Sequence, residues 1–349
     1  MISKIARPEG AMSKKLLFFC LLSVACTILL LFGTPPPPDA VPDGPATGKA
    51  SYRGRYAITT FLASHDDGTY QTRDDQDPYF MSARTLVYQL LHSPNTKLRS
   101  QIPVIVVVTP DVRESKRRRL RADGATVVEV EYIAQNTAVV DDRWTEMATR
   151  LRIFDPTIIP YEKVLFMEPD MVLTRPIVDI LRDPSTDFVL INDATKVSAE
   201  LGTIPERYLM AASPDSLQRD HDYPFLDPEN TVKHFNGGLF VYSPSTEVFQ
   251  YYKSLLNHPE LYYTGSPSQD LINYAHRWGG PMPWKRLHSS WYIDWPNDND
   301  FAGNMALLHS KWWVHESSSS DAVERFALAR RWEMEGYWVG RDGESKYWS

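Results

Sequence analysis

Short apolar runs alternate with amphipathic stretches along the middle of the chain, and this alternation constrains the fold more than any other feature. The sequence predicts strands at residues 56–63, 104–109, 126–130 and 164–167, with helices at 80–91 and 112–122. Apolar strands without polar alternation are typical of a parallel sheet that helices cover on both faces. Because parallel strands need crossover connections, we expect a Rossmann-like α/β domain with a mostly parallel central sheet. This predicted domain spans residues 52–349.

A second apolar run, at residues 16–32, is 17 residues long and carries no charge. It is long enough to span a thin bilayer, and Lys4, Arg7, Lys14 and Lys15 precede it. The positive-inside rule then predicts a cytosolic tail at 1–15, a transmembrane signal anchor at 16–33 and a luminal or external remainder. A cleaved signal peptide is the alternative. The length of the run and the lack of a clear small-x-small cleavage site favour the anchor.

The segment after this run, residues 34–51, is rich in Pro, Gly and Ala. Such a composition favours extended chain, and we interpret the segment as a stem that holds a domain away from a membrane. Both cysteines, Cys20 and Cys26, lie inside the apolar run. The predicted domain therefore has no disulfide, although a luminal compartment would permit one.

Two carboxylates, Glu168 and Asp170, directly follow the predicted strand at 164–167, and Pro169 between them ends regular pairing. Ligands of open α/β sheets bind at this carboxyl edge. Oxygen ligands one residue apart can hold a hard divalent cation, which in turn can hold a diphosphate. Alone, the pattern is more typical of a solvated turn after a buried strand than of a metal site.

Further segments accompany the carboxylates in a fixed order. They are Ala148-Thr-Arg-Leu-Arg-Ile-Phe154, His234-Phe-Asn-Gly-Gly-Leu-Phe-Val-Tyr-Ser-Pro-Ser245, Ser268-Gln-Asp-Leu-Ile-Asn273 and Leu308-His-Ser-Lys-Trp312. In this order and spacing the chain resembles the glycogenin-like retaining glycosyltransferases of family 8, from about residue 55 to residue 315. The resemblance implies a nucleotide-diphospho-sugar transferase domain of the GT-A type.

The same resemblance implies a metal site. In the family, a strand-end Asp-x-Asp and a distant His bind manganese, and the matching positions here are Glu168, Asp170 and His309. We therefore expect Mn²⁺, with Mg²⁺ as the alternative ion. Lys311 matches a lysine that reaches the diphosphate, although the usual His-x-x-Gly-x-x-Lys spacing is shortened to His-Ser-Lys. The alternative to a metal-binding role for His309 is that of a core histidine whose polar groups are satisfied within the protein.

Other positions match residues that contact the donor in the family. The candidate donor-binding residues are Ser64, His65, Arg143, Arg150, Pro169, Asn236, Gly237, Gln269 and Lys311. Three positions depart from the family pattern: Glu168 replaces Asp, Gly237 replaces a hydroxyl residue, and Ser268 replaces the Asp before Gln269, with Asp270 one place later. We assign no catalytic nucleophile, because a double displacement is disputed for such enzymes.

Two clusters of side chains have ordinary explanations as well as functional ones. The predicted helix at 112–122 carries six Lys and Arg from Arg113 to Arg121, but the chain has a net charge of −7, so we interpret it as a solvated face and not a nucleic-acid site. Six of the ten tryptophans lie between Trp278 and Trp313. Most are expected in the core, with one or two against a sugar.

Together these features predict a type II Golgi membrane protein with a luminal catalytic domain. It would transfer a hexosyl group (glucosyl, galactosyl or N-acetylglucosaminyl) from a UDP-sugar to a glycan or glycoprotein acceptor, with retention of configuration. A catalytically inactive relative that binds UDP or a glycan is the alternative, favoured by the three departures. A metal-dependent phosphohydrolase would need a second cluster of carboxylates and histidines, which the sequence does not suggest.

Overall fold

The computed structural model describes residues 54–64, 73–133, 147–194, 197–217, 220–227, 229, 231–314 and 320–343. These residues belong to a compact unit that spans Ala50–Ser349. The predicted tail, anchor and stem at 1–51 lie outside the described residues. Within the described ranges, no helix is both long and apolar enough to cross a membrane.

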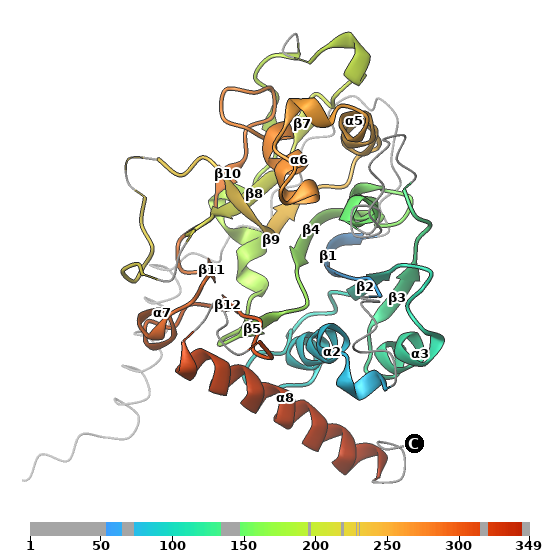
Figure 1. The fold of residues 1–349 in the computed structure, drawn as a ribbon, viewed down its shortest axis with the longest axis vertical. Helices are drawn as coiled ribbons and strands as arrows, with labels where there is room; N and C mark the ends of the chain where they lie inside the picture. Colours follow the sequence, from blue (N-terminus) through green and yellow to red (C-terminus); the bar gives the residue numbers. More distant parts are fainter. Residues whose placement is uncertain are drawn as a thin grey trace, which may run out of the picture. The chain divides into compact units, whose positions relative to one another are not determined.

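A seven-stranded sheet forms the centre of this unit, in the order β10-β8-β9-β4-β1-β2-β3 (Figure 1). Its strands are β1 (Gly54–Leu62), β2 (Val104–Val108), β3 (Thr126–Glu129), β4 (Tyr161–Met167), β8 (Met210–Pro214), β9 (Phe235–Tyr242) and β10 (Lys285–Arg286). All neighbouring pairs are parallel except those that β9 makes with β4 and β8. The predicted mostly parallel, Rossmann-like α/β fold is confirmed.

Two small sheets and a set of helices complete the unit. The small sheets contain β5 (Met171–Leu173), β11 (Tyr292–Asp294) and β12 (Leu307–His309), and β6 (Val189–Leu190) with β7 (Arg207–Tyr208). The α-helices are α2 (Pro78–Leu91), α3 (Glu114–Ala122), α5 (Thr246–Leu256), α6 (Pro267–Ala275), α7 (Asp298–Ala302) and α8 (Asp321–Asp342). The 3-10 helices are η1 (Asp74–Gln76), η2 (Arg150–Phe154), η3 (Val178–Arg182), η4 (Pro184–Thr186), η6 (Ala199–Leu201) and η7 (Pro259–Leu261).

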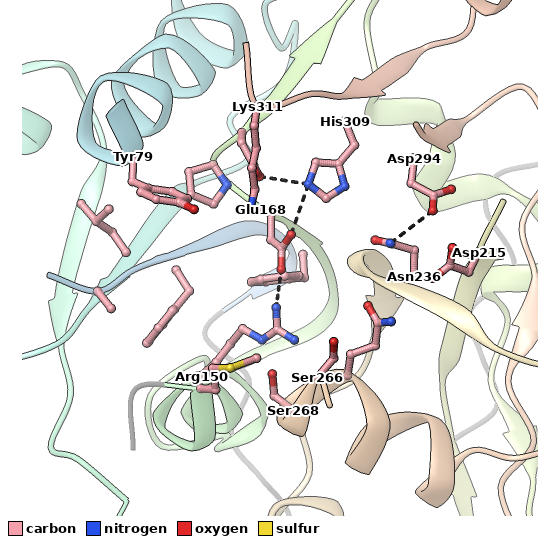
Figure 2. A pocket seen from close by; sticks show the side chains of 18 of the residues that line it. Tyr79, Arg150, Glu168, Asp215, Asn236, Ser266, Ser268, Asp294, His309 and Lys311 are labelled. Atoms are coloured by element: carbon pink, nitrogen blue, oxygen red, sulfur yellow. Dashed lines mark hydrogen bonds and ion pairs between the residues drawn. The ribbon is translucent and has the colours of Figure 1, made fainter. Parts of the chain in front are cut away.

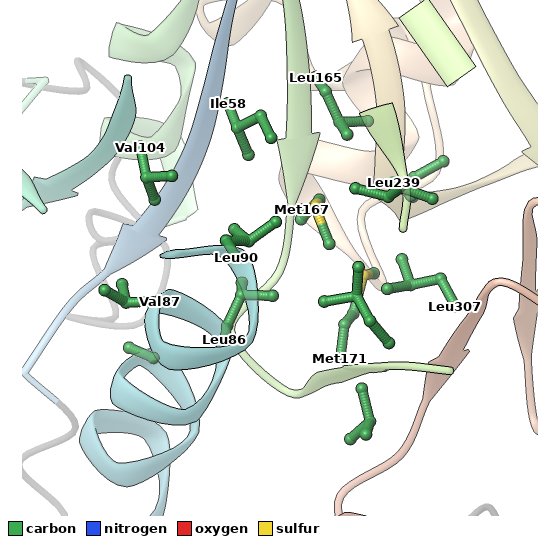
Figure 3. Packing of buried hydrophobic residues seen from close by; sticks show 14 of the residues in the cluster. Ile58, Leu86, Val87, Leu90, Val104, Leu165, Met167, Met171, Leu239 and Leu307 are labelled. Atoms are coloured by element: carbon green, nitrogen blue, oxygen red, sulfur yellow. The ribbon is translucent and has the colours of Figure 1, made fainter. Parts of the chain in front are cut away.

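Alternate residues of the central strands pack on opposite faces of the sheet, as the period of a strand requires. On one face, Ile58 and Leu165 belong to a core cluster with Leu86 and Leu90 of α2 (Figure 3). On the other face, Phe166 belongs to a cluster with residues of α5 and α6. Each fully buried side chain of this kind contributes about 1.5–3 kcal/mol. Burial on both faces explains why the strands read as unbroken apolar runs.

Two regions differ from the sequence prediction. Residues 194–233 are polar and contain prolines without a clear period, a pattern that predicts loops and short helices, but they include β7 and β8. β8 contains Met, Ala and Ser in place of β-branched residues, so its pairing with β9, and not its propensity, makes it a strand. The apolar segment 188–191 predicts a strand that returns to the core. It forms only β6, where Leu190 is 74% exposed, in the sheet with β7.

The basic helix α3 is also less solvated than predicted. Lys116 is buried and forms an ion pair with Asp77, which caps α2 by accepting from the Phe80 N–H. Arg117 pairs with Glu129 on β3. The expectation of a fully solvated face is therefore wrong at Lys116, because α3 packs against the start of α2.

Candidate active site

Glu168 and Asp170 lie where β4 ends, at the carboxyl edge of the central sheet. The Glu168 N–H donates to the carbonyl oxygen of Gly238 on β9 (2.9 Å). After Asp170 the chain enters β5, which pairs antiparallel with β12, so that Met171 lies opposite His309. This strand pairing brings His309 beside carboxylates about 140 positions earlier in the chain.

The three side chains form one group of potential metal ligands. His309 Nε2 lies 3.1 Å from Asp170 Oδ1 and 3.4 Å from Glu168 Oε2. All three ligand atoms lie within 4.8 Å of one another. The Asp170 side chain is only 4% exposed, whereas that of Glu168 is 28% exposed. One carboxylate is thus held in the protein, and the other faces the cavity.

The hydrogen bonds around His309 determine which of its ring nitrogens faces the carboxylates. Asn236 Oδ1 accepts from the Gly238 N–H (2.9 Å), which fixes the orientation of the amide. The Tyr292 hydroxyl must then donate its proton to Asn236 Oδ1 (2.6 Å). Its oxygen therefore accepts from the Nδ1–H of His309 (2.8 Å), and Nε2 points at the carboxylates. This is the tautomer in which Nε2 can bind a metal ion.

The charges of the group explain its protonation. Burial alone would lower the pKa of His309, but the charge and hydrogen bond of Asp170, with the charge of Glu168, outweigh it and raise the pKa to about 9. Burial would raise the pKa of Asp170, yet His309 and Lys311 hold it below its usual value. Without a metal, a proton on Nε2 therefore occupies the place of a cation.

Two basic side chains flank the carboxylates. Arg150, from η2, forms an ion pair with Glu168. Lys311 follows β12, and its ammonium lies 5.9 Å from the centre of the Tyr79 ring. Burial would lower the pKa of Lys311, but Tyr79 and Asp170 raise it above its usual value. Two permanent positive charges beside a metal site suit a diphosphate.

These residues line one cavity of about 680 Å³ (Figure 2). Arg150 and the metal-ligand group lie between Tyr79 on one side and Asp215 and Asp294 on the other. The cavity-lining residues are Phe61, Leu62, Ala63, Tyr79, Met147, Arg150, Phe166, Glu168, Pro169, Asp170, Asp215, Asn236, Ser266, Ser268, Gln269, Asp294, Trp295, His309, Lys311 and Val314.

Most of the residues predicted from the sequence meet at this cavity. Its lining includes Glu168, Pro169, Asp170, His309, Lys311, Arg150, Asn236 and Gln269. Ser64 is the last described residue of its loop, and it directly follows Ala63, which lines the cavity. His65 and Arg143 lie outside the described residues.

The departures at Gly237 and Ser268 have local structural counterparts. The Gly237 N–H donates to Gln269 Oε1 (2.7 Å). A Cβ at position 237 would lie 3.1 Å from Gln269 and 3.3 Å from Arg150, so those two side chains occupy the space of the missing hydroxyl. Ser268 lines the cavity, whereas Asp270 accepts from the Ser266 N–H (2.6 Å) at the start of α6.

The polar side chains of the cavity that were not predicted from the sequence include Tyr79, Asp215 and Asp294, and Trp295 was only one of six clustered tryptophans. Burial, together with the hydrogen bond and charge of Asp215, raises the pKa of Asp294 to about 7. The Ser216 N–H (3.0 Å) and hydroxyl (2.8 Å) both donate to Asp294 Oδ1. No sequence motif marks these carboxylates, since Asp215 directly follows β8 and Asp294 ends β11, and the two strands belong to different sheets.

The chain has distant relatives among known proteins. No family profile matches the chain. An uncharacterised protein of Schizosaccharomyces pombe is 27% identical over 275 residues, which cover 70% of each chain. Galactinol synthase 10 of Arabidopsis thaliana is 22% identical over 305 residues, covering 77% of this chain and 81% of that enzyme.

A solved structure of similar fold is that of the bifunctional glycosyltransferase WbbM. It has 14% sequence identity and a TM-score of 0.51, over 82% of this chain and 52% of that one. The fold of this chain is therefore similar to that of a solved glycosyltransferase, and its sequence is distantly similar to that of galactinol synthases.

Proposed function

We propose that this protein is a metal-dependent retaining glycosyltransferase that moves a hexosyl group from a UDP-sugar to a glycan or glycoprotein acceptor. The observation that carries the proposal is the group of Glu168, Asp170 and His309 at the carboxyl edge of the sheet, with Arg150 and Lys311 beside it. This arrangement places ligands for a cation and two basic groups around a single cavity. A diphosphate that leaves a sugar needs both.

The residues fit a divalent ion. Two carboxylates and one imidazole are a donor set that suits manganese, and Mg²⁺ favours the same oxygen ligands. The hydrogen bonds of Tyr292 and Asn236 orient Nε2 of His309 toward the carboxylates. When bound, the ion would neutralise the charge that develops on the leaving diphosphate.

The protein's own side chains would bind and orient the donor. Lys311 and Arg150 would contact the phosphates, and Asn236 and Gln269 lie where the sugar would follow. In the transfer, the acceptor hydroxyl oxygen forms a bond to the anomeric carbon of the sugar. The bond between that carbon and the diphosphate oxygen breaks, its electron pair leaves with UDP, and the hydroxyl proton passes to the leaving phosphate.

The name of the Arabidopsis relative supports a galactosyl donor among the three hexoses that we consider. The UDP moiety and the retention of configuration rest on the resemblance to glycogenin-like enzymes. Glucosyl and N-acetylglucosaminyl donors therefore belong in the same test.

The test is UDP release by the full-length protein in detergent, from UDP-galactose, UDP-glucose and UDP-N-acetylglucosamine, with Mn²⁺ or with a chelator. Asp170→Asn and His309→Ala should each lower metal-dependent release by more than about 100-fold. The matched controls are Asp179→Asn and His258→Ala, because both side chains are exposed partners of surface ion pairs. These controls should keep the wild-type rate.

The same experiment separates the inactive alternative. A folded protein that binds UDP with Mn²⁺, but releases none from any sugar, would be a binding protein and not a transferase. Release that continues in chelator, or that survives both ligand variants, would overturn the metal-dependent mechanism.

We further propose that residues 16–33 anchor the protein in the Golgi membrane, with the catalytic part in the lumen. The support is the uncharged run with its preceding basic residues. The measurement is protease protection of a C-terminal tag in sealed Golgi vesicles. Cleavage of the tag without detergent would contradict this orientation.

A further inference from the structure

Trp295 stands out among the residues that line the cavity. It follows β11 directly, lines the cavity and is 42% exposed. Its φ is +53°, in the left-handed region that bulky residues rarely adopt. Backbone strain and exposure of an indole are both unfavourable, and such outliers concentrate at ligand sites.

The chain on both sides of Trp295 is held firmly. Before it, the Ser216 hydroxyl donates to the backbone oxygen of Asp294 (2.8 Å) as well as to its carboxylate. After it, Asn297 caps α7 in a reciprocal capping box with Asp300. Hydrogen bonds on both sides therefore hold the backbone that carries Trp295 at the cavity.

The surroundings of Trp295 differ from those of the metal-ligand group. Asp215 and Asp294 form the wall of the cavity that lies away from Tyr79 (Figure 2). Val314 also lines the cavity and is 43% exposed. Carboxylates accept hydrogen bonds from hydroxyl groups, and they repel anions. An aromatic face beside such acceptors suits a ring with hydroxyl groups at its edge and C–H groups on one face.

We propose that Trp295, Asp215 and Asp294 form the acceptor subsite, and that this subsite takes a neutral polyhydroxylated ring, as in a sugar or a cyclic polyol. The C–H face of the ring lies on the indole, and its hydroxyl groups donate to the two carboxylates. This inference rests on the proposed transferase function. The 42% exposure of Trp295 favours the acceptor over the donor sugar. The Asn236 amide donates to Asp294 Oδ2 (3.4 Å), so this subsite adjoins the residues proposed for the donor sugar (Figure 2).

The test compares acceptors and variants in the full-length protein with Mn²⁺. The acceptor panel contains neutral monosaccharides, disaccharides, cyclic polyols and uronic acids. Trp295→Gly removes the indole but accepts a positive φ without strain, and Trp295→Phe restores an aromatic face. Trp332→Ala is the control, since Trp332 is 60% exposed on α8.

For Trp295→Gly we expect kcat/KM for a neutral acceptor to fall about 10-fold more than donor hydrolysis without acceptor falls. Trp295→Phe should recover most of this loss, and Trp332→Ala should show none. An equal loss of hydrolysis and transfer would assign Trp295 to the donor sugar and overturn the proposal. A preference for uronic acids would contradict the role of the two carboxylates.

A binding measurement separates this inference from the proposed function. Saturation-transfer NMR with UDP and the diamagnetic ion Mg²⁺ reports which acceptor protons contact the protein, without any turnover. If the wild type binds a neutral ring through one C–H face and Trp295→Gly does not, the subsite stands even when no sugar is transferred. If the panel binds neither protein, or binds both equally, the inference is wrong.

Discussion

His309 and His276 lie in two regions of the molecule, and their environments are opposite. At the cavity, His309 is partly buried, and Asp170 and Glu168 raise its pKa to about 9 against the effect of burial. His276 is fully buried at the end of α6, and burial lowers its pKa to about 4. There the Tyr252 hydroxyl donates to Nε2 (2.5 Å), and the Nδ1–H donates to the Met282 oxygen (2.7 Å).

The difference shows what each region is built to hold. His276 has both ring nitrogens satisfied as a neutral donor and acceptor, so the core uses it as a structural group. His309 has one nitrogen held by Tyr292, and its other nitrogen faces negative charge. Two carboxylates around an imidazole nitrogen of fixed orientation suit a bound cation. The surroundings of His276 contain no such group of carboxylates among the partners described above.

The largest expected effects come from removing each histidine in turn. His309→Ala should abolish detectable Mn²⁺ binding, a loss of more than about 100-fold, because one of three protein ligands is gone. His276→Ala should leave Mn²⁺ affinity unchanged but lower the free energy of unfolding by about 3 kcal/mol, since two buried partners lose their hydrogen bonds. Calorimetric titration with Mn²⁺ and urea unfolding measure the two quantities. A loss of metal affinity in His276→Ala would remove the contrast between the regions.

Acid should destabilise the core region through His276. Its folded pKa of about 4 lies below the unfolded value of 6.5, so the folded state resists protonation. Its contribution to stability is therefore complete above pH 6.5 and is lost as the pH falls toward 4, by about 3 kcal/mol. His276→Gln, which cannot titrate, should show a flatter stability curve in this window. Urea unfolding from pH 7 to pH 4 makes the comparison, and parallel curves would contradict it.

Tyr292 sharpens the comparison from the side of the cavity. Tyr292→Phe removes the hydroxyl that holds the Nδ1–H of His309, so the imidazole loses its fixed orientation. We expect Mn²⁺ affinity to fall 10- to 100-fold, as for other outer partners of metal ligands. Tyr208→Phe is the control, because the Tyr208 hydroxyl donates to Pro283 on the core side. Similar affinities in both variants would mean that Tyr292 does not position His309.

The same contrast explains which parts of the structure could be predicted from the sequence. Strands such as β4 were predicted because burial on both faces leaves a continuous apolar run. Glu168, Asp170 and His309 were identified because their segments follow strands and resemble a known family. Asp215 and Asp294 were missed, because β8, which precedes Asp215, lacks a strand signal, and because Asp294 ends β11 in a different sheet. Trp295 was one of six candidate tryptophans, and only its strained turn distinguishes it.

The smallest expected effects come from two glycines. One, Gly238, lies beside the metal-ligand group, and the other, Gly336, is exposed on α8. At Gly238 a Cβ would lie 2.8–2.9 Å from Met171, Asn236 and His309, so Gly238→Ala must displace the metal-ligand group and should cost about 1–3 kcal/mol. At Gly336, within α8, an added Cβ meets nothing within 4 Å, so Gly336→Ala should instead stabilise the protein by about 0.5–1 kcal/mol. Urea unfolding of both variants gives the signs, and Mn²⁺ titration should show weaker binding in Gly238→Ala alone. If Gly238→Ala kept both its stability and its metal affinity, β9 would not determine the position of His309, and β12 and Tyr292 together would be sufficient to hold it.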